Sequence, residues 1–288
     1  MAKSGILTPS SAYLLVYHGS RDSRSQSSAH HLAMLVAKRL QQRTQALRSR
    51  DSVISGEFAL ASKMSKQIET PHSKSKQHEL NAAPHVGTAA LELSPRSLHE
   101  QIQQFGDRLQ TVGCRQLHIL PLFLLSGVHV KEDIPAEIEQ AQPPLENKLD
   151  IHLHSFLGSH PQLSHYVKTL LEDSALSGAD ATILMAHGSR REGGNAPIEA
   201  IASRIGATSA YWSVSPSLAD RIQELRGAGQ RHITIFPYFL FPGGITDAIA
   251  QTVDELSARY SDMRLRLAQP LGATPEIADL VIDLMTEH

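Results

Sequence analysis

The sequence has a single cysteine, little net charge and no long apolar run. Cys114 alone excludes an internal disulfide framework and a four-cysteine metal site. The 29 acidic and 27 basic residues leave a formal net charge of −2, so no positive field favours nucleic acid. No run approaches the length that spans a membrane, and the first residues lack the apolar core of a signal peptide. We therefore expect a cytoplasmic protein without nucleic-acid or membrane partners.

Common catalytic signatures are also missing. The sequence contains no G-x-S-x-G motif and no paired cysteines, so it does not support hydrolase or redox chemistry. Each of the two His-Gly-Ser-Arg segments contains one glycine, and neither contains the Gly-Lys-Ser/Thr sequence of a nucleotide phosphate loop. They are therefore a weak match to such a loop. Their backbone N–H groups, with Arg21 and Arg190, would suit an anionic ligand with carboxylates, although both arginines equally suit a solvated surface.

What the sequence does have is an internal repeat of four landmarks in the same order. They are YLLVYHGSR (13–21) with ILMAHGSR (183–190), TAALELSPRSL (88–98) with SAYWSVSPSL (209–218), the P-x-F-L-x-x-G pattern at 121–127 and 237–243, and FLGSHPQL (156–163) with PLGATPEI (270–277). Random composition would rarely supply four such matches in order. The sequence therefore predicts a duplication.

Strand and helix signals alternate within each copy. Apolar residues recur at helical spacing behind Ser97, which can form a capping box with Glu100, and again behind Ser217. This alternation predicts parallel strands joined by right-handed crossovers. The expected fold class is α/β, with two similar domains at about 12–176 and 180–288. Each is expected to be a small, mostly parallel sheet flanked by helices.

The first copy is longer than the second. From His18 to the second landmark is 70 residues, against 22 in the second copy, an excess of 48. The extra residues, about 48–85, are rich in Ser, Lys, Gln and His without sustained periodicity, so we expect a mobile surface insertion. Its histidines, His72, His78 and His85, fit a weak metal-loading arm, but ordinary loop residues are the favoured interpretation.

One histidine follows the third landmark. The apolar run 117–125 predicts a buried strand, with Pro121 near its end. Asp133 is positioned to cap a following helix whose first turn contains Pro135. His129 should therefore lie in the loop after the carboxyl end of a strand, where ligands bind in open α/β sheets.

Superposing the two copies brings three pairs of polar positions into register. His18 corresponds to His187, Glu92 to Ser213, and His129 to Ile245. The first copy thus holds a His/Glu/His set, which suits a borderline divalent ion. Three ligands would leave open positions, as a catalytic metal site requires. The alternative is that both His-Gly-Ser-Arg histidines only stabilise their turns, and that the glutamate faces solvent.

These motifs resemble the sirohydrochlorin chelatases, the class II chelatases of the cobalamin and sirohaem pathways. The resemblance rests on His-Gly-Ser-Arg after a strand (18–21), on P-x-F-L-x-x-G-x-H followed by Asp-Ile-Pro (121–135), and on the L-G-x-x-P landmark. It covers both copies. The long form of this family is a duplication with its active cleft between the halves, one of which keeps the histidines, and the resemblance implies the same here.

The resemblance also implies an activity, the ATP-independent insertion of a divalent metal into sirohydrochlorin. The family's catalytic and metal-binding histidines fall on His18 and His129, and Glu92 matches a further metal-binding position. The residues then expected beside the tetrapyrrole are Ser20, Arg21, Gly127 and Val128. The metal, Co²⁺ or Fe²⁺ with Ni²⁺ as a further candidate, is a substrate, and no permanently bound cofactor is expected. The last residues lack the paired cysteines of some long cobaltochelatases, so ferrochelatase activity is at least as compatible.

Two other functions stay open. A metal or tetrapyrrole carrier would use the same cleft without catalysing insertion. A two-domain binding protein for a small anionic metabolite would use the cleft and not the histidines. Because a duplicated chain needs no second copy to form the cleft, we expect a monomer.

Overall fold

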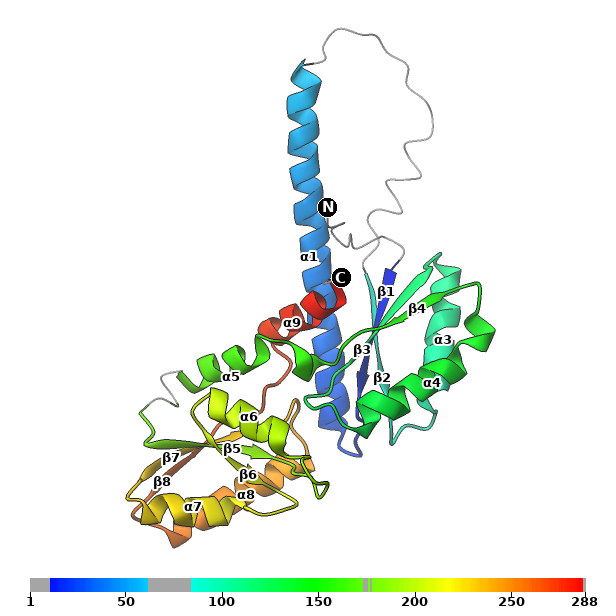
Figure 1. Cartoon of the computed structure of the whole chain (residues 1–288). Coiled ribbons are helices and arrows are strands. Elements are labelled where there is room, and N and C mark those ends of the chain that lie inside the picture. Colours follow the sequence, from blue (N-terminus) through cyan, green and yellow to red (C-terminus); the bar gives the residue numbers. More distant parts are fainter. Residues whose placement is uncertain (1–10, 62–83, 173–175, 177, 287–288) are drawn as a thin grey trace.

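The computed structural model describes residues 11–61, 84–172, 176 and 178–286, with side chains described outside 47–61. Two four-stranded parallel sheets flanked by helices form the molecule (Figure 1). Their strand orders, β2-β1-β3-β4 and β6-β5-β7-β8, are the same when each half is counted from its own start. The predicted α/β class with two similar parallel sheets is therefore confirmed.

The elements follow one another in the same pattern in each half. The first half contains β1 (Ser11–Tyr17), α1 (Ser23–Ala61), β2 (His85–Ala90), α3 (Leu98–Thr111), β3 (Gln116–Pro121), a π-helical turn (His129–Asp133), α4 (Ile134–Ala141), β4 (Asp150–Leu153) and α5 (Leu163–Glu172), with short 3₁₀ turns at Pro143–Leu145 and Leu157–Ser159. The second half contains β5 (Ala181–Ala186), α6 (Ala196–Arg204), β6 (Thr208–Tyr211), α7 (Leu218–Gly227), β7 (His232–Pro237), α8 (Gly244–Arg259), β8 (Arg264–Leu267) and α9 (Pro275–Thr286).

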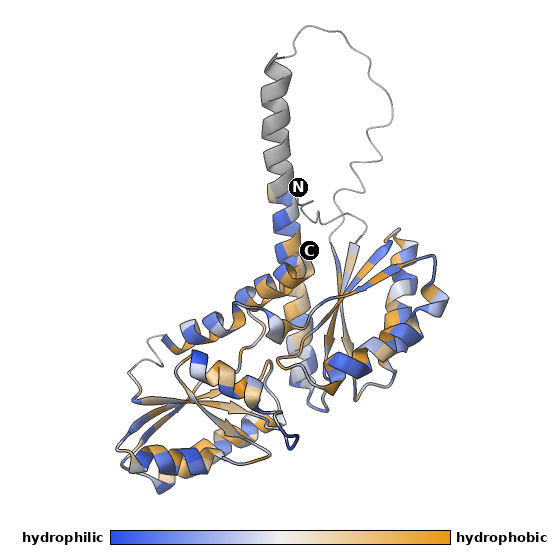
Figure 2. Cartoon of the chain, in the orientation of Figure 1, coloured by the Kyte–Doolittle hydropathy of each residue, from blue (hydrophilic) through white to orange (hydrophobic). Residues whose placement is uncertain are grey.

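The central strand of each sheet is covered on both faces. All seven residues of β1 are buried. Tyr13 and Leu15 face a core that includes α1, whereas Leu14 and Val16 face a second core with α3 and α4. Figure 2 shows the apolar strands lying between the helices in both halves. The first half is thus a three-layer sandwich, and this fixes which strand ends reach the surface.

Several local predictions are also confirmed. Ser97 and Glu100 form the capping box at the start of α3, and Ser217 forms one with Asp220 at the start of α7. β3 ends at Pro121, as predicted, because proline has no backbone N–H to donate to a neighbouring strand.

The expected insertion is partly different from the prediction. α1 continues to Ala61, so the first part of the segment 48–85 is helical and not irregular. His85 is the first residue of β2 and pairs in register with Ala12, so it is not a loop residue. His72 and His78 lie outside the described residues. A helix propagates by adding one hydrogen bond per residue, and it needs no apolar periodicity to do so. No described helix, α1 included, is both long and apolar enough to cross a membrane.

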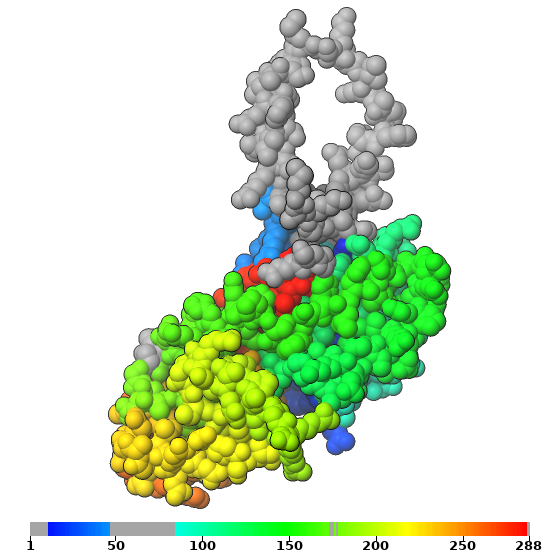
Figure 3. Space-filling model, viewed as in Figure 1, coloured from blue at the N-terminus to red at the C-terminus, as the bar shows by residue number. Residues whose placement is uncertain are grey.

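The last helix of each half packs against the other half. α9 lies along α1, with Arg43 Nη1 2.9 Å from Asp283 Oδ1. Figure 3 shows α9, in red, at the junction with the first half. α5 in turn contacts α6, since Arg204 donates to the Ser164 hydroxyl at 3.2 Å. The division expected at residues 176–180 falls between α5 and β5, but one shared core of buried residues joins the two sheets.

A second contact joins the halves near the start of α1. Arg24 donates to both carboxylate oxygens of Asp247 on α8, at 3.1 and 2.5 Å, and also to Asp22 at 2.5 Å. These hydrogen bonds lower the pKa of both carboxyls below their ordinary value. All three side chains are solvent-accessible, so we expect the contact to add little to stability.

Asp247→Asn tests this contact through its pH dependence. The pKa of Asp247 is lowered in the folded chain from its ordinary 3.8, so its contribution to stability is fully present above pH 3.8 and is lost as the pH falls through the lower folded value. We expect the variant to unfold at a slightly lower temperature than wild type at neutral pH. This difference in the unfolding midpoint should shrink as the pH falls below 3.8. Asp254→Asn, an exposed residue on the same helix, is the control. Equal decreases in both variants at every pH would contradict the role of Arg24.

Candidate active site

Parallel pairing brings the ends of three strands to one edge of the first sheet. The ladder between β1 and β2 continues beyond the strands, as Glu92 N donates to His18 O at 2.9 Å. On the other side of β1, Leu122 N donates to Val16 O at 2.7 Å. The second half repeats the first of these bonds, from Ser213 N to His187 O at 2.9 Å. The superposition of the two copies predicted from sequence therefore holds at these positions.

The turn after β1 depends on glycine. Gly19 has φ +96°, and a Cβ there would lie 1.9 Å from the carbonyl oxygen of Glu92. The Ser20 hydroxyl then accepts the backbone N–H of Asp22 at 3.0 Å, which closes the turn. The second half has the same turn, with φ +84° at Gly188. The glycine thus lets the His18 loop lie directly against the strand end that carries Glu92.

The segment that carries His129 differs from the loop we predicted. His129 is the first residue of a π-helical turn, in which Ile134 N donates to His129 O, five residues back. Asp133 does not cap a helix, because α4 continues from this turn. Its Oδ2 instead lies 2.6 Å from Nδ1 of His129. A carboxylate only accepts hydrogen bonds, so Nδ1 carries a proton, and in the neutral ring Nε2 is the nitrogen that keeps its lone pair.

The π-helical turn is tied to the fold through α4. Glu137 on α4 accepts from the backbone N–H of His99 at 2.7 Å and lies 3.0 Å from its Nδ1. His99 belongs to the first turn of α3, where backbone N–H groups lack partners within the helix. Buried Ile134 and Ile138 hold the other side of α4 against the core. Residue 129 is therefore placed by a packed helix.

His18, Glu92 and His129 meet at this edge. Within the described residues they are the one group of three His, Cys, Asp or Glu side chains that could hold a metal ion, with ligand atoms within 4.8 Å of one another. Nδ1 of His18 lies 3.9 Å from Oε2 of Glu92. The two imidazole rings meet edge to face with centroids 4.8 Å apart, and the Phe123 ring lies 5.9 and 6.0 Å from them.

The ligand set is open and only partly pre-formed. Two ligands at about 2.1 Å from one ion can be at most about 4.2 Å apart, so side chains must rotate slightly before all three can bind. His18 and Glu92 are free to do so, since 53% and 49% of their side-chain surface is exposed, whereas His129 is 34% exposed and is held by Asp133. Imidazole and carboxylate together suit borderline divalent ions. The arrangement can hold such an ion and leave coordination positions for a second ligand.

The other predicted site residues surround this group. Ser20 and Arg21 are exposed on the turn after His18, and Gly127 is exposed just before the π-helical turn. Val128 is half-buried at its start.

The second half has no equivalent ligand set at these positions. Ile245 is exposed on α8 in place of a histidine. The Ser213 hydroxyl donates to the carbonyl of the exposed His187 at 2.9 Å.

Sequence reasoning missed two residues of the site. Asp133 was assigned to a helix cap, although its i+4 spacing from His129 would place the two side chains together in a helical segment. Phe123 entered the sequence analysis only as part of the repeated P-x-F-L-x-x-G pattern, although its ring contacts both imidazole rings.

Comparison with known proteins agrees with the sequence motifs. The sequence model of the CbiX family matches residues 63–174 and 181–288, which is most of the chain in two copies. The chain belongs to the CbiX family. The resemblance to sirohydrochlorin chelatases is thereby confirmed, and the chain is an enzyme of the chelatase class. His18 lies outside the matched residues, so its assignment rests on the geometry above.

Two curated proteins and one solved structure illustrate the similarity. The sirohydrochlorin cobaltochelatase of Priestia megaterium is 22% identical over 71% of this chain and 70% of its own length. The sirohydrochlorin ferrochelatase of the same organism is 23% identical over 50% and 58%. A structure of SirB from Bacillus subtilis with Fe³⁺ has a TM-score of 0.65 and 19% identity, over 95% of this chain and 93% of its own. This CbiX protein thus shares the fold of SirB.

Gly19→Ala should damage both the fold and the site. A left-handed φ costs an alanine about 1–2 kcal/mol, and here the contact with the Glu92 carbonyl adds to it. We expect more than about 2 kcal/mol of lost unfolding free energy, measured with urea, and weaker Co²⁺ binding. Gly113→Ala has a similar φ of +78° but meets no atom within 4 Å. Gly113→Ala should therefore lose only the unfolding free energy that the left-handed φ costs. An equal loss in both variants would contradict the close contact between residue 19 and the Glu92 carbonyl.

Asp133→Asn should weaken metal binding without unfolding the chain. Loss of a carboxylate partner to a metal-binding histidine typically costs 10–100-fold in affinity. We expect that loss for Co²⁺, measured by its visible absorption spectrum. Glu132→Gln removes a neighbouring charge in the same turn and serves as the control. Unchanged affinity in Asp133→Asn, or equal loss in both variants, would contradict the role of the His129–Asp133 contact.

Proposed function

We propose that this CbiX protein inserts a divalent metal, Co²⁺ or Fe²⁺, into sirohydrochlorin without ATP. The observation that carries the proposal is the solvent-accessible His18–Glu92–His129 group at the carboxyl edge of the first sheet, with His129 partly buried. Such a group can hold an ion with few, exchangeable ligands and still present it to another molecule. The names of the curated relatives, which include both a cobaltochelatase and a ferrochelatase, support this substrate class and leave the metal as the variable to be measured.

The proposed chemistry requires proton removal as well as metal transfer. A tetrapyrrole loses two pyrrole N–H protons for each divalent ion that it accepts. A neutral imidazole can take up a proton near neutral pH, and two imidazole rings lie 4.8 Å apart in the site. The Asp133 contact leaves Nε2 of His129 available either for the metal or for a proton. His18 and His129 are therefore proposed as both metal-binding and catalytic residues, and Glu92 as a metal ligand.

The same proposal assigns the neighbouring backbone to the substrate. The carboxylates of sirohydrochlorin would be held by Arg21 and by the exposed loops at Ser20 and Gly127–Val128. We further propose a cytoplasmic monomer built of two duplicated units, 12–176 and 180–288. The shared core between the sheets supports this, because it joins the halves without a second chain.

The test is metal insertion followed by the absorbance of sirohydrochlorin, with Co²⁺, Fe²⁺ and Ni²⁺ supplied separately and no ATP added. We expect acceleration over the uncatalysed reaction, and a loss of at least about 100-fold in His18→Ala and in His129→Ala, because general-base groups contribute that much. His187→Ala is the matched control, since it has the equivalent turn in the second half.

Two results would count against the proposal. Binding of sirohydrochlorin and metal without any acceleration would favour a carrier. Acceleration that survives in both His18→Ala and His129→Ala would exclude the proposed site.

A further inference from the structure

The carboxyl edge of the second sheet carries apolar side chains where that of the first carries metal ligands. Trp212 is the residue after β6, and its backbone N–H donates to Ala186 O at 2.9 Å, so it lies beside the end of β5. Ile245 lies in the first turn of α8, in the place of His129. Trp212 and Ile245 are 41% and 36% exposed. Packing within the second half therefore does not account for either side chain.

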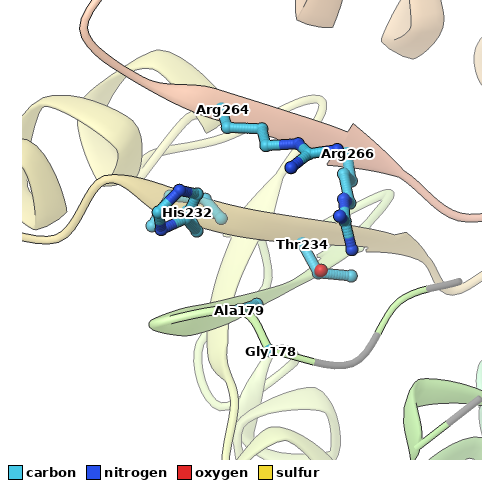
Figure 4. A pocket seen from close by; sticks show the side chains of 7 residues that line it. Gly178, Ala179, His232, Thr234, Arg264 and Arg266 are labelled. Atoms are coloured by element: carbon cyan, nitrogen blue, oxygen red, sulfur yellow. The ribbon is translucent and has the colours of Figure 1, made fainter. Parts of the chain in front are cut away.

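The opposite edge of the same sheet is polar. A cavity of about 120 Å³ lies there (Figure 4), lined by residues 178–179 and 232–234 with Arg264 and Arg266. His232 and Arg264 are the first residues of their strands, so this cavity and Trp212 are at opposite ends of the sheet. The second sheet is thus not apolar at both ends, and the exposed tryptophan and isoleucine are a feature of its carboxyl edge.

The carboxyl edges of the two sheets meet. α1 follows β1 and α8 follows β7, so each helix begins at the carboxyl edge of its own sheet. Their first turns are joined, because Arg24 of α1 donates to Asp247 of α8 at 3.1 Å. Asp247 is two residues from Ile245, and Arg24 is six residues from His18. The apolar edge of the second sheet therefore borders the histidine site.

The first half adds an exposed apolar residue of its own at this border. Leu93 directly follows Glu92, and 59% of it is exposed. Its φ of +55° lies in the left-handed region, which disfavours residues that have a Cβ. A leucine at this position is thus neither buried nor favoured by the backbone. Residues held in such conformations cluster at functional sites, and this one adjoins the proposed metal ligand.

An apolar surface beside a metal-ligand group fits a flat organic ring better than a small hydrated ligand. A tetrapyrrole has its metal-binding nitrogens at the centre of a conjugated ring and its carboxylates on the rim. The faces of that ring are apolar, and an indole can stack on them with a large contact area. A small hydrated anion would gain nothing from a tryptophan or an isoleucine. The exposed side chains therefore point to the macrocycle itself.

We propose that Leu93, Trp212 and Ile245 hold the macrocycle of the substrate over the His18–Glu92–His129 group, with the indole of Trp212 against one face of the ring. This inference rests on the proposed function and assigns a part in it to the second half. That half then supplies apolar binding surface where the first supplies metal ligands. The three exposed side chains are covered only in the complex, so their hydrophobic burial contributes to substrate affinity.

The first test is the KM for sirohydrochlorin, together with the dissociation constant of metal-free sirohydrochlorin, followed by its visible absorbance with the full chain. For Trp212→Ala we expect both constants to rise about tenfold, which is within the range that stacking on an aromatic side chain supplies. We expect kcat to stay within about twofold of wild type, because the contact is made equally in the ground state and the transition state. Trp212→Phe keeps a ring and should recover most of the affinity.

Val112→Ala is the matched control for this test. It removes another exposed apolar side chain, at the end of α3, and should leave both constants and kcat unchanged. A cooperative thermal transition in each variant shows that it is folded.

Leu93→Asn separates substrate binding from folding. Asparagine tolerates a left-handed φ better than leucine does, so the thermal unfolding midpoint should equal or exceed that of wild type. The KM for sirohydrochlorin should nevertheless rise. A lower unfolding midpoint, or an unchanged KM, would overturn the role of Leu93.

The outcomes distinguish this inference from the proposed function. Metal insertion by wild type, with unchanged KM and dissociation constant in Trp212→Ala, would overturn the aromatic contact and leave the proposed function standing. A loss of kcat in Trp212→Ala without a rise in KM would overturn it as well. Binding of sirohydrochlorin without insertion, weakened in Trp212→Ala, would support the contact and overturn the proposed function. If wild type neither bound nor metallated sirohydrochlorin, both would be overturned.

Discussion

The parallel pairing of β1 with a strand on each side is the constraint on which the site depends. Parallel strands end at the same edge, so the residues that follow β1, β2 and β3 must meet although the chain separates them widely. The bond from Glu92 N to His18 O extends this pairing one step beyond the strands. The His18–Glu92–His129 group is thus a consequence of sheet register, and a slip of the strand pairing by one residue would turn its side chains to the other face of the sheet.

Duplication shows which parts of this edge the fold requires. Both halves keep the left-handed glycine and the hydroxyl that accepts an N–H two residues on, at Ser20 and at Ser189. These groups satisfy backbone geometry. The polar side chains at this edge differ between the halves. The Ser213 hydroxyl donates to the His187 carbonyl where the first half has Glu92, and Ile245 is exposed where the first half has His129.

Sequence reasoning reached the sheets, the capping boxes and the grouping of His18, Glu92 and His129, because each depends on local periodicity or on strand order. It did not predict the π-helical turn at His129. The same residues could form the i→i+4 hydrogen bonds of an α-helix or the i→i+5 bond seen here, and packing decides between them. The cap assigned to Asp133 followed the usual preference of aspartate. The sequence also did not predict that α5 and α9 each pack against the other half. Periodicity shows that a helix has an apolar face, but it does not show which half of the molecule covers that face.

The contrast between His129 and its two partners bears on how a chelatase can release its metal. His129 is oriented by Asp133 and belongs to a segment fixed by α4. His18 and Glu92 extend from turns, are about half exposed and lie 3.9 Å apart, too far for a direct hydrogen bond. A cage with three fixed ligands would bind an ion tightly and retain it. Under the proposed function, one oriented ligand with two yielding ones would hold the ion while a tetrapyrrole replaces the protein ligands in turn.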